Sequence, residues 1–231
     1  RDFCLSRGLG DVYKRQVYDV NPDAEAVALL APYKAKIDSM MYRVVGTAEM
    51  SMDRGIPESL LSNLVADVLR GAAVQVLGKP ADMGLVNIGG LRNVLTEGPV
   101  TCGNIYEILP FENSLCVVTL KGTDLNHLFE NIAACGGEGV SGVQLHITKD
   151  GKLLRATVAG KPVVEDRMYT VATIDYLADG NDGMTALIRA EKRECPQGAT
   201  LRSLFMDYVE RQTAAGKKIT SRMEGRITVE D

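Results

Sequence analysis

The sequence predicts an α+β fold in which a mixed β-sheet packs against several helices. Apolar runs of strand length and amphipathic runs of helix length are interspersed along its 231 residues. They lack the regular strand–helix–strand alternation that is typical of parallel α/β sheets. Hydrophobic residues make up 45% of the chain and charged residues 24%, which is ordinary for a globular protein. The length is enough for one large domain with its own buried core.

The chain divides into three predicted parts. Residues 1–16, RDFCLSRGLGDVYKRQ, follow neither hydrophobic period and contain no signal-peptide core, so they do not look like part of a fold. They resemble a translated vector or sequencing-adapter scar. We therefore expect the native N-terminus to be missing, together with any signal peptide or lipid-attachment cysteine. Residues 17–44 are predicted to be a linker helix region, and residues 45–231 the main domain.

Two helices are predicted in the first third of the chain. One begins at Asn21-Pro22, because Asn caps helix N-termini and Pro fits the first turn, and Pro32 is expected to kink or restart it. The other begins near Pro57-Glu58, and Gly78 ends that region. The expected apolar faces are Val27, Leu30, Ile37 and Met41 in the first helix, and Leu61, Leu64, Val65, Val68 and Leu69 in the second.

The predicted strands are short apolar or alternating runs. An Asp150-Gly151 turn is expected to join two of them as a hairpin. The predicted strands are Met83–Val86, Leu115–Leu120, Val143–Thr148, Leu153–Val158, Tyr169–Ile174 and Arg226–Val229.

Two further helices are predicted, one from Gly122-Thr123 and one after Thr200. Their apolar residues recur at helical spacing, so one face of each is expected to be buried. These residues are Leu125, Leu128, Phe129 and Ile132 in the first, and Leu201, Leu204, Phe205, Tyr208 and Val209 in the second.

Composition excludes several classes of function. A net charge of −4 and a pI near 5.4 argue against a nucleic-acid partner, which favours a basic face. Charged residues interrupt every long apolar run, so no transmembrane segment is predicted. The five cysteines are scattered without a CxxC pair, which excludes a zinc ribbon and predicts no disulfide framework. An odd number of cysteines leaves at least one free thiol.

The chain is organised around the stretch from Val86 to Phe111. A strand ends at Asn87, and two glycines, Gly89 and Gly90, follow it before Arg92. Glycines at the end of a strand let backbone amides approach a ligand. Asn can donate and accept hydrogen bonds at the same place, and Arg can bind a carboxylate or phosphate. Taken alone, these residues also fit an ordinary turn with a surface arginine.

Three motifs in order resemble one known family. They are NIGGLR (Asn87–Arg92), ILPFEN (Ile108–Asn113) and YLADGNDG (Tyr176–Gly183). In spacing and chemistry they are similar to the C-terminal domain of the 5'-nucleotidases, a family that includes UDP-sugar hydrolases and ecto-5'-nucleotidases. The resemblance runs from about Glu58 to Val229. It implies an α+β domain of the 5'-nucleotidase C-terminal type that binds a nucleoside or nucleotide.

The resemblance also implies a role for each site residue. Phe111 and Tyr176 would hold the base between two aromatic faces, and Asp182 would accept hydrogen bonds from the ribose hydroxyls. Asn87 and Arg92 would contact the sugar or phosphate, and Gly89 and Gly90 would keep the backbone close to the ligand. Asn113 matches an asparagine that contacts the base in bacterial members. The plain alternatives are core packing for Phe111, a core or interface tyrosine at 176, and an Asx-turn aspartate at 182.

One position departs from the family. Animal members have a phosphate-binding arginine near the start of the second helix, and the matching place here is around Pro57. That contact is therefore either missing or supplied by Arg54.

No catalytic centre or metal site is predicted in this chain. The family hydrolyses phosphate monoesters with two metal ions held by Asp, His and Asn residues of an N-terminal domain. The two histidines here, His127 and His146, have no carboxylate at ligand spacing and are predicted to be structural or solvated. We expect Zn, Mn or similar divalent ions in a partner metallophosphatase domain, and we expect this chain to be inactive alone.

Three readings of the function follow. In the first, the chain is the recognition domain that acts with a separate metallophosphatase chain in nucleotide catabolism. In the second, it is a stand-alone nucleoside-binding module. In the third, it is a fragment of a full-length enzyme. The resemblance implies a periplasmic or cell-surface location.

Overall fold

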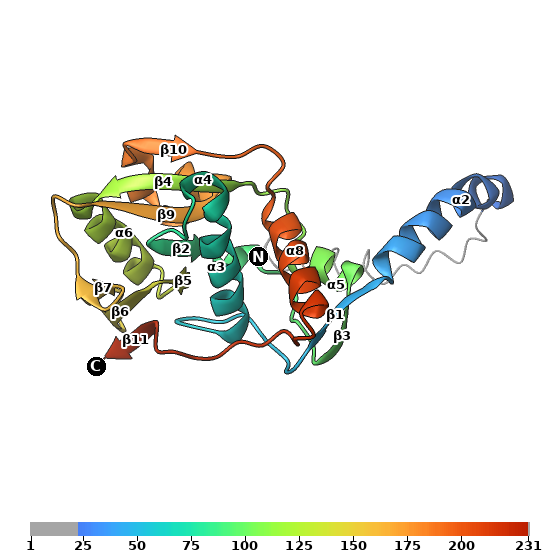
Figure 1. Cartoon of the computed structure of the whole chain (residues 1–231), viewed down its shortest axis with the longest axis horizontal. Coiled ribbons are helices and arrows are strands. Elements are labelled where there is room, and N and C mark those ends of the chain that lie inside the picture. The colour runs from blue at the N-terminus through green and yellow to red at the C-terminus, as the bar shows by residue number, and fades with distance from the viewer. Residues whose placement is uncertain (1–22, 231) are drawn as a thin grey trace, which may run out of the picture. The chain divides into compact units, whose positions relative to one another are not determined.

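The structure is a computed structural model that describes residues 23–230 (Figure 1). The predicted scar at residues 1–16 and the predicted start at Asn21-Pro22 lie outside the described residues. The chain separates into two units, with the division after Ser39.

Helix α2 (Ala24–Met41) is the described element of the first unit. The Asp23 carboxylate accepts hydrogen bonds from the Glu25 and Ala26 amides at 2.9 and 3.0 Å, so it caps the first turn. The helix runs through Pro32 without a break, and the expected restart there is wrong. None of its residues is buried, and of the predicted apolar face Val27, Leu30 and Ile37 are exposed while Met41 is partly buried.

The second unit contains a five-stranded mixed sheet of order β10-β4-β9-β2-β5. Strands β2 and β9 are parallel, and the other neighbours are antiparallel. All four residues of β2 are buried, so both faces of the sheet are covered at this strand. The strands are β2 (Met83–Val86), β4 (Leu115–Lys121), β5 (Gly139–Ser141), β9 (Met168–Ile174) and β10 (Lys192–Glu194). The predicted mixed sheet is confirmed, although β5 and β10 had not been predicted.

Helix α3 (Leu60–Ala72) packs against this sheet at β2, β5 and β9 (Figure 1). Ser59 and Ser62 form a capping box at its start. The contact is close at Gly84, where a Cβ atom would lie 2.5 Å from the Ala66 carbonyl oxygen. The short helix α4 (Val74–Leu77) follows and ends at Gly78, which has φ +69°. All five residues of the predicted apolar stripe of α3 are buried.

Helix α6 (Gly122–Ala134) packs against β4 and β9 and also against a second sheet. Its four predicted inward residues are all buried. The second sheet has the order β11-β6-β7-β8, with β11 parallel to β6. Its strands are β6 (Val143–Thr148), β7 (Leu153–Val158), β8 (Lys161–Pro162) and β11 (Ile227–Glu230).

A third, two-stranded sheet pairs β1 (Val44–Ala48) with β3 (Gly98–Thr101). Helix α8 (Leu201–Ala214) lies against β1, α3 and α5 (Cys102–Ile108). Thr200 caps α8, as its place before the predicted helix indicates. Of the five predicted inward residues of α8, Tyr208 is half-buried and the others are buried. Strands β1 and β3 and helix α5 had not been predicted.

One disulfide joins Cys116 in β4 to Cys195, which follows β10. The partners are separated by 79 positions, so their spacing carried no signal. The prediction from the scattered cysteines therefore missed this bond. Cys102 and Cys135 are free among the described residues.

One described stretch, Leu60–Leu77, is long and apolar enough to span a membrane by length and composition. It covers α3 and α4, and 50% of it is buried inside the protein. Core helices of globular proteins pass the same test, so this stretch is weak evidence for a membrane span.

Candidate functional site

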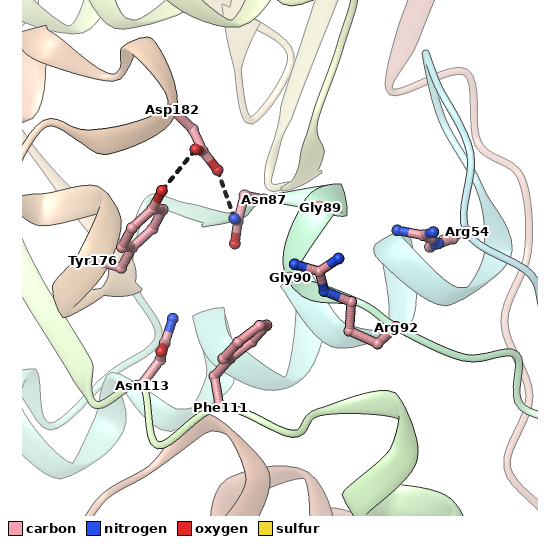
Figure 2. Close-up of a pocket in the computed structure, with 9 residues that line it drawn as sticks. All are labelled: Arg54, Asn87, Gly89, Gly90, Arg92, Phe111, Asn113, Tyr176 and Asp182. Carbon is pink, nitrogen blue, oxygen red and sulfur yellow. Dashed lines mark hydrogen bonds between the residues drawn. The ribbon is translucent and has the colours of Figure 1, made fainter. Parts of the chain in front are cut away.

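A cavity of about 440 Å³ lies at one end of the central sheet. The structure brings all eight predicted binding residues to its wall, together with Arg54 (Figure 2). The lining residues are Arg54, Asn87, Gly89, Gly90, Arg92, Phe111, Asn113, Tyr176 and Asp182.

Parallel pairing of β2 and β9 explains why distant residues meet here. Because the two strands run in the same direction, their carboxyl ends lie at the same edge of the sheet. Asn87 directly follows β2, and helix α7 (Asp175–Ala178) directly follows β9 and carries Tyr176. The connection between α5 and β4 adds Phe111 and Asn113.

Asp182 is the hydrogen-bonding centre of the pocket. Its two carboxylate oxygens accept from Asn87 Nδ2 at 2.7 Å and from Tyr176 Oη at 2.9 Å (Figure 2). The bond to the carboxylate raises the pKa of the Tyr176 phenol. Each carboxylate oxygen has a second lone pair. Two accepting positions therefore remain for a ligand that carries neighbouring hydroxyl groups.

Asp182 also has an unusual backbone conformation. It lies in the turn η2 (Asn181–Gly183) with φ +52° and ψ +31°, in the left-handed region where Asp and Asn are tolerated best after glycine. Asn181 Nδ2 donates to the Tyr176 carbonyl oxygen at 2.8 Å and ties the turn to α7. The backbone therefore fixes the carboxylate beside the Tyr176 ring.

Asn87 contributes an acceptor with no partner among the described residues. The residue is 6% exposed, and its Oδ1 is buried without a hydrogen bond. An unpaired buried acceptor costs free energy unless a ligand pairs with it. At Gly90, a Cβ atom would lie 2.8 Å from this oxygen. The turn η1 (Ile88–Gly90) therefore needs glycine at position 90 for the Asn87 side chain to keep its place.

Two aromatic side chains enter the pocket from separate segments (Figure 2). Phe111 is 44% exposed and Tyr176 is 40% exposed, so neither ring is a core residue. Exposed rings beside a cavity can stack on a flat ligand, at about 1–3 kcal/mol for each base–aromatic contact. Asn113 lies between them in the same view. The alternative of core packing for Phe111 does not agree with its exposure.

Two arginines give the other side of the pocket a positive charge. The Arg92 guanidinium lies 5.2 Å from the centre of the Phe111 ring, within cation–π range. Arg54 Nη1 donates to the Ile88 carbonyl oxygen at 3.5 Å. The sequence identified Arg54 only as a substitute for the missing arginine near Pro57, and the structure places it on the pocket wall.

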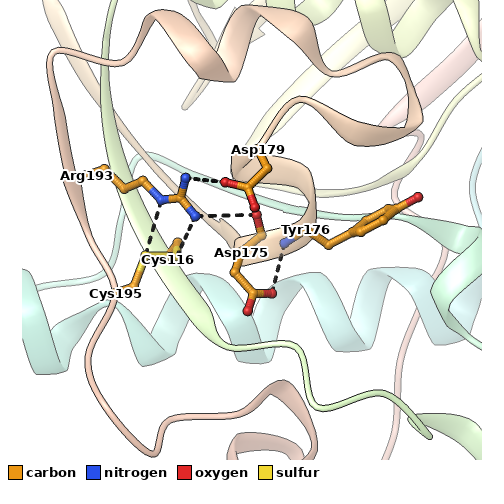
Figure 3. Close-up of a disulfide and its surroundings, with 6 residues drawn as sticks. All are labelled: Cys116, Asp175, Tyr176, Asp179, Arg193 and Cys195. Carbon is orange, nitrogen blue, oxygen red and sulfur yellow. Dashed lines mark hydrogen bonds and ion pairs between the residues drawn. A yellow bond between two sulfur atoms is a disulfide. The ribbon is translucent and has the colours of Figure 1, made fainter.

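Helix α7, which carries Tyr176, is held from behind by Arg193 in β10 (Figure 3). The Arg193 guanidinium donates to Asp179 Oδ1 at 2.6 Å and to the Asp175 carbonyl oxygen at 3.5 Å. Its Nε also lies 3.4 Å from Cys195 Sγ of the disulfide. Arg193 therefore holds both ends of α7, and the disulfide fixes the segment that follows β10 to β4.

Glu138 is the residue that the sequence analysis missed. Its Oε2 accepts a hydrogen bond from the Ile88 amide at 2.6 Å, and the residue is 9% exposed. Burial raises the pKa of this carboxyl to about 7, and the nearby Asp182 charge adds to the increase, although the Ile88 amide opposes it. An acid between glycines, in GGEG, is typical of an exposed loop, so no local pattern indicated a buried group.

The described residues offer no set that fits a metal ion. No group of three or more His, Cys, Asp or Glu side chains within residues 23–230 is arranged to hold one. His127 Nδ1 pairs with Glu130 at 3.1 Å, and His146 Nδ1 pairs with Glu230 at 2.6 Å. Each histidine therefore has a carboxylate neighbour, contrary to the sequence prediction. His146 also contacts Arg155 Nη2 through Nε2 at 2.8 Å and Thr228 Oγ1 through Nδ1 at 2.9 Å, so neither histidine belongs to a set of metal ligands within residues 23–230.

Comparison with known proteins finds a family profile and several relatives. A sequence profile described as "5'-nucleotidase, C-terminal domain" matches residues 44–189. Endonuclease YhcR of Bacillus subtilis is 32% identical over 167 residues, which cover 69% of this chain and 13% of that protein. An apyrase of Aedes aegypti is 28% identical over 235 residues, which cover 92% of this chain and 40% of that protein.

Solved structures with a similar fold were also found. The crystal structure of a 5'-nucleotidase precursor from Thermus thermophilus matches with a TM-score of 0.75 and 28% identity, over 87% of this chain and 42% of that chain. A Haemophilus influenzae NAD nucleotidase has a TM-score of 0.68 at 19% identity, over 98% of this chain and 45% of that chain, which shows the fold alone. The chain thus spans less than half the length of each relative named here. By its matched profile and its fold, this chain belongs to the 5'-nucleotidase C-terminal domain family.

Proposed function

We propose that this domain binds the nucleoside part of a nucleotide. The main support is the arrangement of Phe111 and Tyr176, two half-exposed rings that enter one cavity beside a hydrogen-bonded carboxylate. A nucleotide base is flat and weakly polar, so aromatic faces are its natural contacts. A ribose offers two neighbouring hydroxyl groups, which match the two free accepting positions of Asp182.

The polarity of the pocket gives the ligand a direction. The base lies between Phe111 and Tyr176, within reach of Asn113. The ribose lies at Asp182, beside Asn87, which donates to the same carboxylate. The 5'-phosphate points toward Arg92 and Arg54, because guanidinium groups bind phosphate with charge-assisted hydrogen bonds. This orientation leaves the phosphate on the side of the pocket away from Tyr176 (Figure 2).

The reaction itself belongs to a second domain in this proposal. The chain covers 42% of the Thermus 5'-nucleotidase precursor, and no metal set is present among residues 23–230. We infer a partner metallophosphatase domain, on the same or another chain, that carries two divalent ions. The pair would hydrolyse nucleoside 5'-phosphates or related esters. The domain described here would select the substrate and position its phosphate.

A location outside the cytoplasm fits two observations. The Cys116–Cys195 disulfide is of a kind that persists in oxidising compartments. The relative named cell wall protein Lmo0130 of Listeria monocytogenes is 28% identical over 90% of this chain. We propose a periplasmic or cell-surface protein.

Titration calorimetry of the chain with adenosine and AMP, in EDTA and then with Mn²⁺, tests this proposal. We expect adenosine and AMP to bind in EDTA without phosphate release, and Tyr176→Ala to weaken adenosine binding by about tenfold or more. Tyr42→Ala is the matched control, because Tyr42 is exposed and lies outside the cavity. Failure of both ligands to bind would contradict the recognition role. Metal-dependent phosphate release by this chain alone would contradict the need for a partner.

A further inference from the structure

Glu138 lies directly behind the ligand-facing turn. In the sheet, Gly139 of β5 pairs with Val86, the last residue of β2. The preceding residue, Glu138, is therefore brought beside Asn87 and Ile88, where β2 ends. Its buried carboxyl accepts the Ile88 amide at 2.6 Å. This bond crosses from one strand connection to another and fixes the first residue of η1.

The backbone of Ile88 is held at its amide and at its carbonyl oxygen, which belong to two successive peptide groups. Glu138 accepts from its amide, and Arg54 donates to its carbonyl oxygen. Gly89 and Gly90 follow at once and line the cavity. At Gly89 a Cβ atom would meet nothing within 4 Å, so the turn is open there. Within the turn the Gly90 amide donates to the Asn87 carbonyl oxygen at 3.1 Å, and the bonds of Ile88 to Glu138 and Arg54 hold the turn from outside.

Titratable and charged groups face Glu138 from several elements. Asp182 of η2 raises the pKa of Glu138 through its charge. Cys135, at the end of α6, has a thiol whose pKa is raised by burial and by the charges of Glu138 and Asp182. Its Sγ also contacts the Asp182 carbonyl oxygen at 3.5 Å. The cationic Arg54 lies across the Ile88 peptide.

We propose that Glu138 is a positioning residue, which holds the Ile88–Gly90 turn for the ligand and tunes affinity through the protonation state of its buried carboxyl. This inference rests on the proposed nucleoside-binding function and deepens it. A protonated carboxyl still accepts the Ile88 amide through its carbonyl oxygen, and it places no charge beside Asp182. An ionised carboxyl keeps the bond but adds a second negative charge next to the group that receives the ribose hydroxyls.

In this proposal, ligand binding favours the protonated form of Glu138. A bound nucleoside displaces the water that screens Asp182 and Glu138 from each other, and lower screening strengthens their repulsion. The complex therefore takes up a proton from solvent onto Glu138 when it forms near neutral pH. By linkage, affinity is higher below the pKa of Glu138 and falls as pH rises through about 7.

The test is calorimetry with adenosine between about pH 5.5 and 8.5 in buffers of different ionisation enthalpy. Adenosine is used because, unlike AMP, it has no phosphate that titrates near about pH 6. The wild-type chain is expected to lose affinity roughly three- to tenfold between about pH 6 and 8.5 and to take up a fraction of a proton on binding. Glu138→Gln keeps an oxygen for the Ile88 amide and should bind with no such pH dependence.

Glu138→Ala completes the set, because it removes the hydrogen bond as well as the charge. It should bind adenosine more weakly at every pH, and thermal unfolding curves show whether it is folded. Glu130→Gln is the matched control, since Glu130 is exposed on α6, and it should keep the wild-type pH profile. If Glu138→Gln keeps that profile too, the inference is wrong. Adenosine binding by the wild type with no pH dependence overturns the inference alone, whereas no binding in any variant overturns the proposed function with it.

Discussion

At the scale of single residues, Asp182 combines two roles that can be separated. It fixes Asn87 and Tyr176 by hydrogen bonds, and in the proposed function it also receives the ribose hydroxyls. Its positive φ limits the substitutions that the backbone accepts. Asn is the best replacement, because it tolerates this conformation and has the same shape.

Asp182→Asn should therefore weaken the binding of ribonucleosides more than the binding of 2',3'-dideoxynucleosides. The amide loses the charge and half of the accepting capacity, and only ligands with ribose hydroxyls depend on that capacity. We expect a loss of about tenfold for adenosine and a smaller loss for its dideoxy analogue, measured by calorimetry. Equal losses for both ligands would remove Asp182 from the ribose contact.

The raised pKa of Glu138 also predicts that the stability of the fold depends on pH. Its pKa is raised from the ordinary 4.5 to about 7 in the folded state, so the folded state holds the proton more tightly than the unfolded state. Its stabilising contribution is complete below pH 4.5 and is lost as pH rises through about 7. The free energy of unfolding of Glu138→Gln, relative to that of the wild type, should therefore rise by roughly 2–3 kcal/mol between about pH 5 and 8. Thermal unfolding at both pH values measures this gain, and a difference that stays constant contradicts it.

The residues that line the cavity could be found from sequence because each belongs to a compact motif. Asn87, Phe111 and Tyr176 stand beside glycines or at the ends of apolar runs, where a side chain at a strand end is exposed to a ligand. Glu138 does not belong to a sequence pattern that indicates burial or binding. Its burial arises from the pairing of β5 with β2, a long-range contact that local sequence does not show. The role of these residues in binding stays a prediction.

At the scale of elements, β10, which the sequence did not predict, supports the helix that carries Tyr176. Strand β10, with the sequence KRE, has no apolar pattern, yet it pairs with β4 and brings Arg193 and Cys195 behind α7 (Figure 3). Strand β4 was predictable, because its apolar run indicates a buried strand. Short polar strands such as β10 form only because a longer neighbour offers free hydrogen-bonding groups.

Removing the disulfide should loosen this element and the helix that it supports. The double variant Cys116→Ser/Cys195→Ser is expected to lose about 2–4 kcal/mol of stability, because the bond closes a long loop in the unfolded chain. Denaturant unfolding measures the loss. Adenosine affinity should fall as well, since Arg193 then holds α7 without its covalent support. Cys135→Ser is the control for stability, and a double variant as stable as this control would contradict the prediction.

At the scale of the whole molecule, everything that lines the pocket belongs to the unit that begins at Met40. The unit has its own core, which contains residues of all three sheets. The core of this unit includes no residue of α2. A chain that starts at Met40 should keep the Tm and the adenosine affinity of the full chain. A large loss of either would show that the preceding residues stabilise the domain.

In the proposed function, the parallel pairing of β2 and β9 gathers the contacts to the ribose, which all ribonucleotides share, while part of the contact to the variable base comes from elsewhere. The proposed sugar contacts, Asn87 and Asp182, come from segments that follow these two strands. Two of the three proposed base contacts, Phe111 and Asn113, come from a different connection, between α5 and β4, whereas the third, Tyr176, follows β9. In the proposed function, substitutions in the α5–β4 connection would therefore change the preferred base while Tyr176 keeps its stacking role. Selection can diversify the range of nucleotides accepted while the sheet and the ribose anchor stay the same.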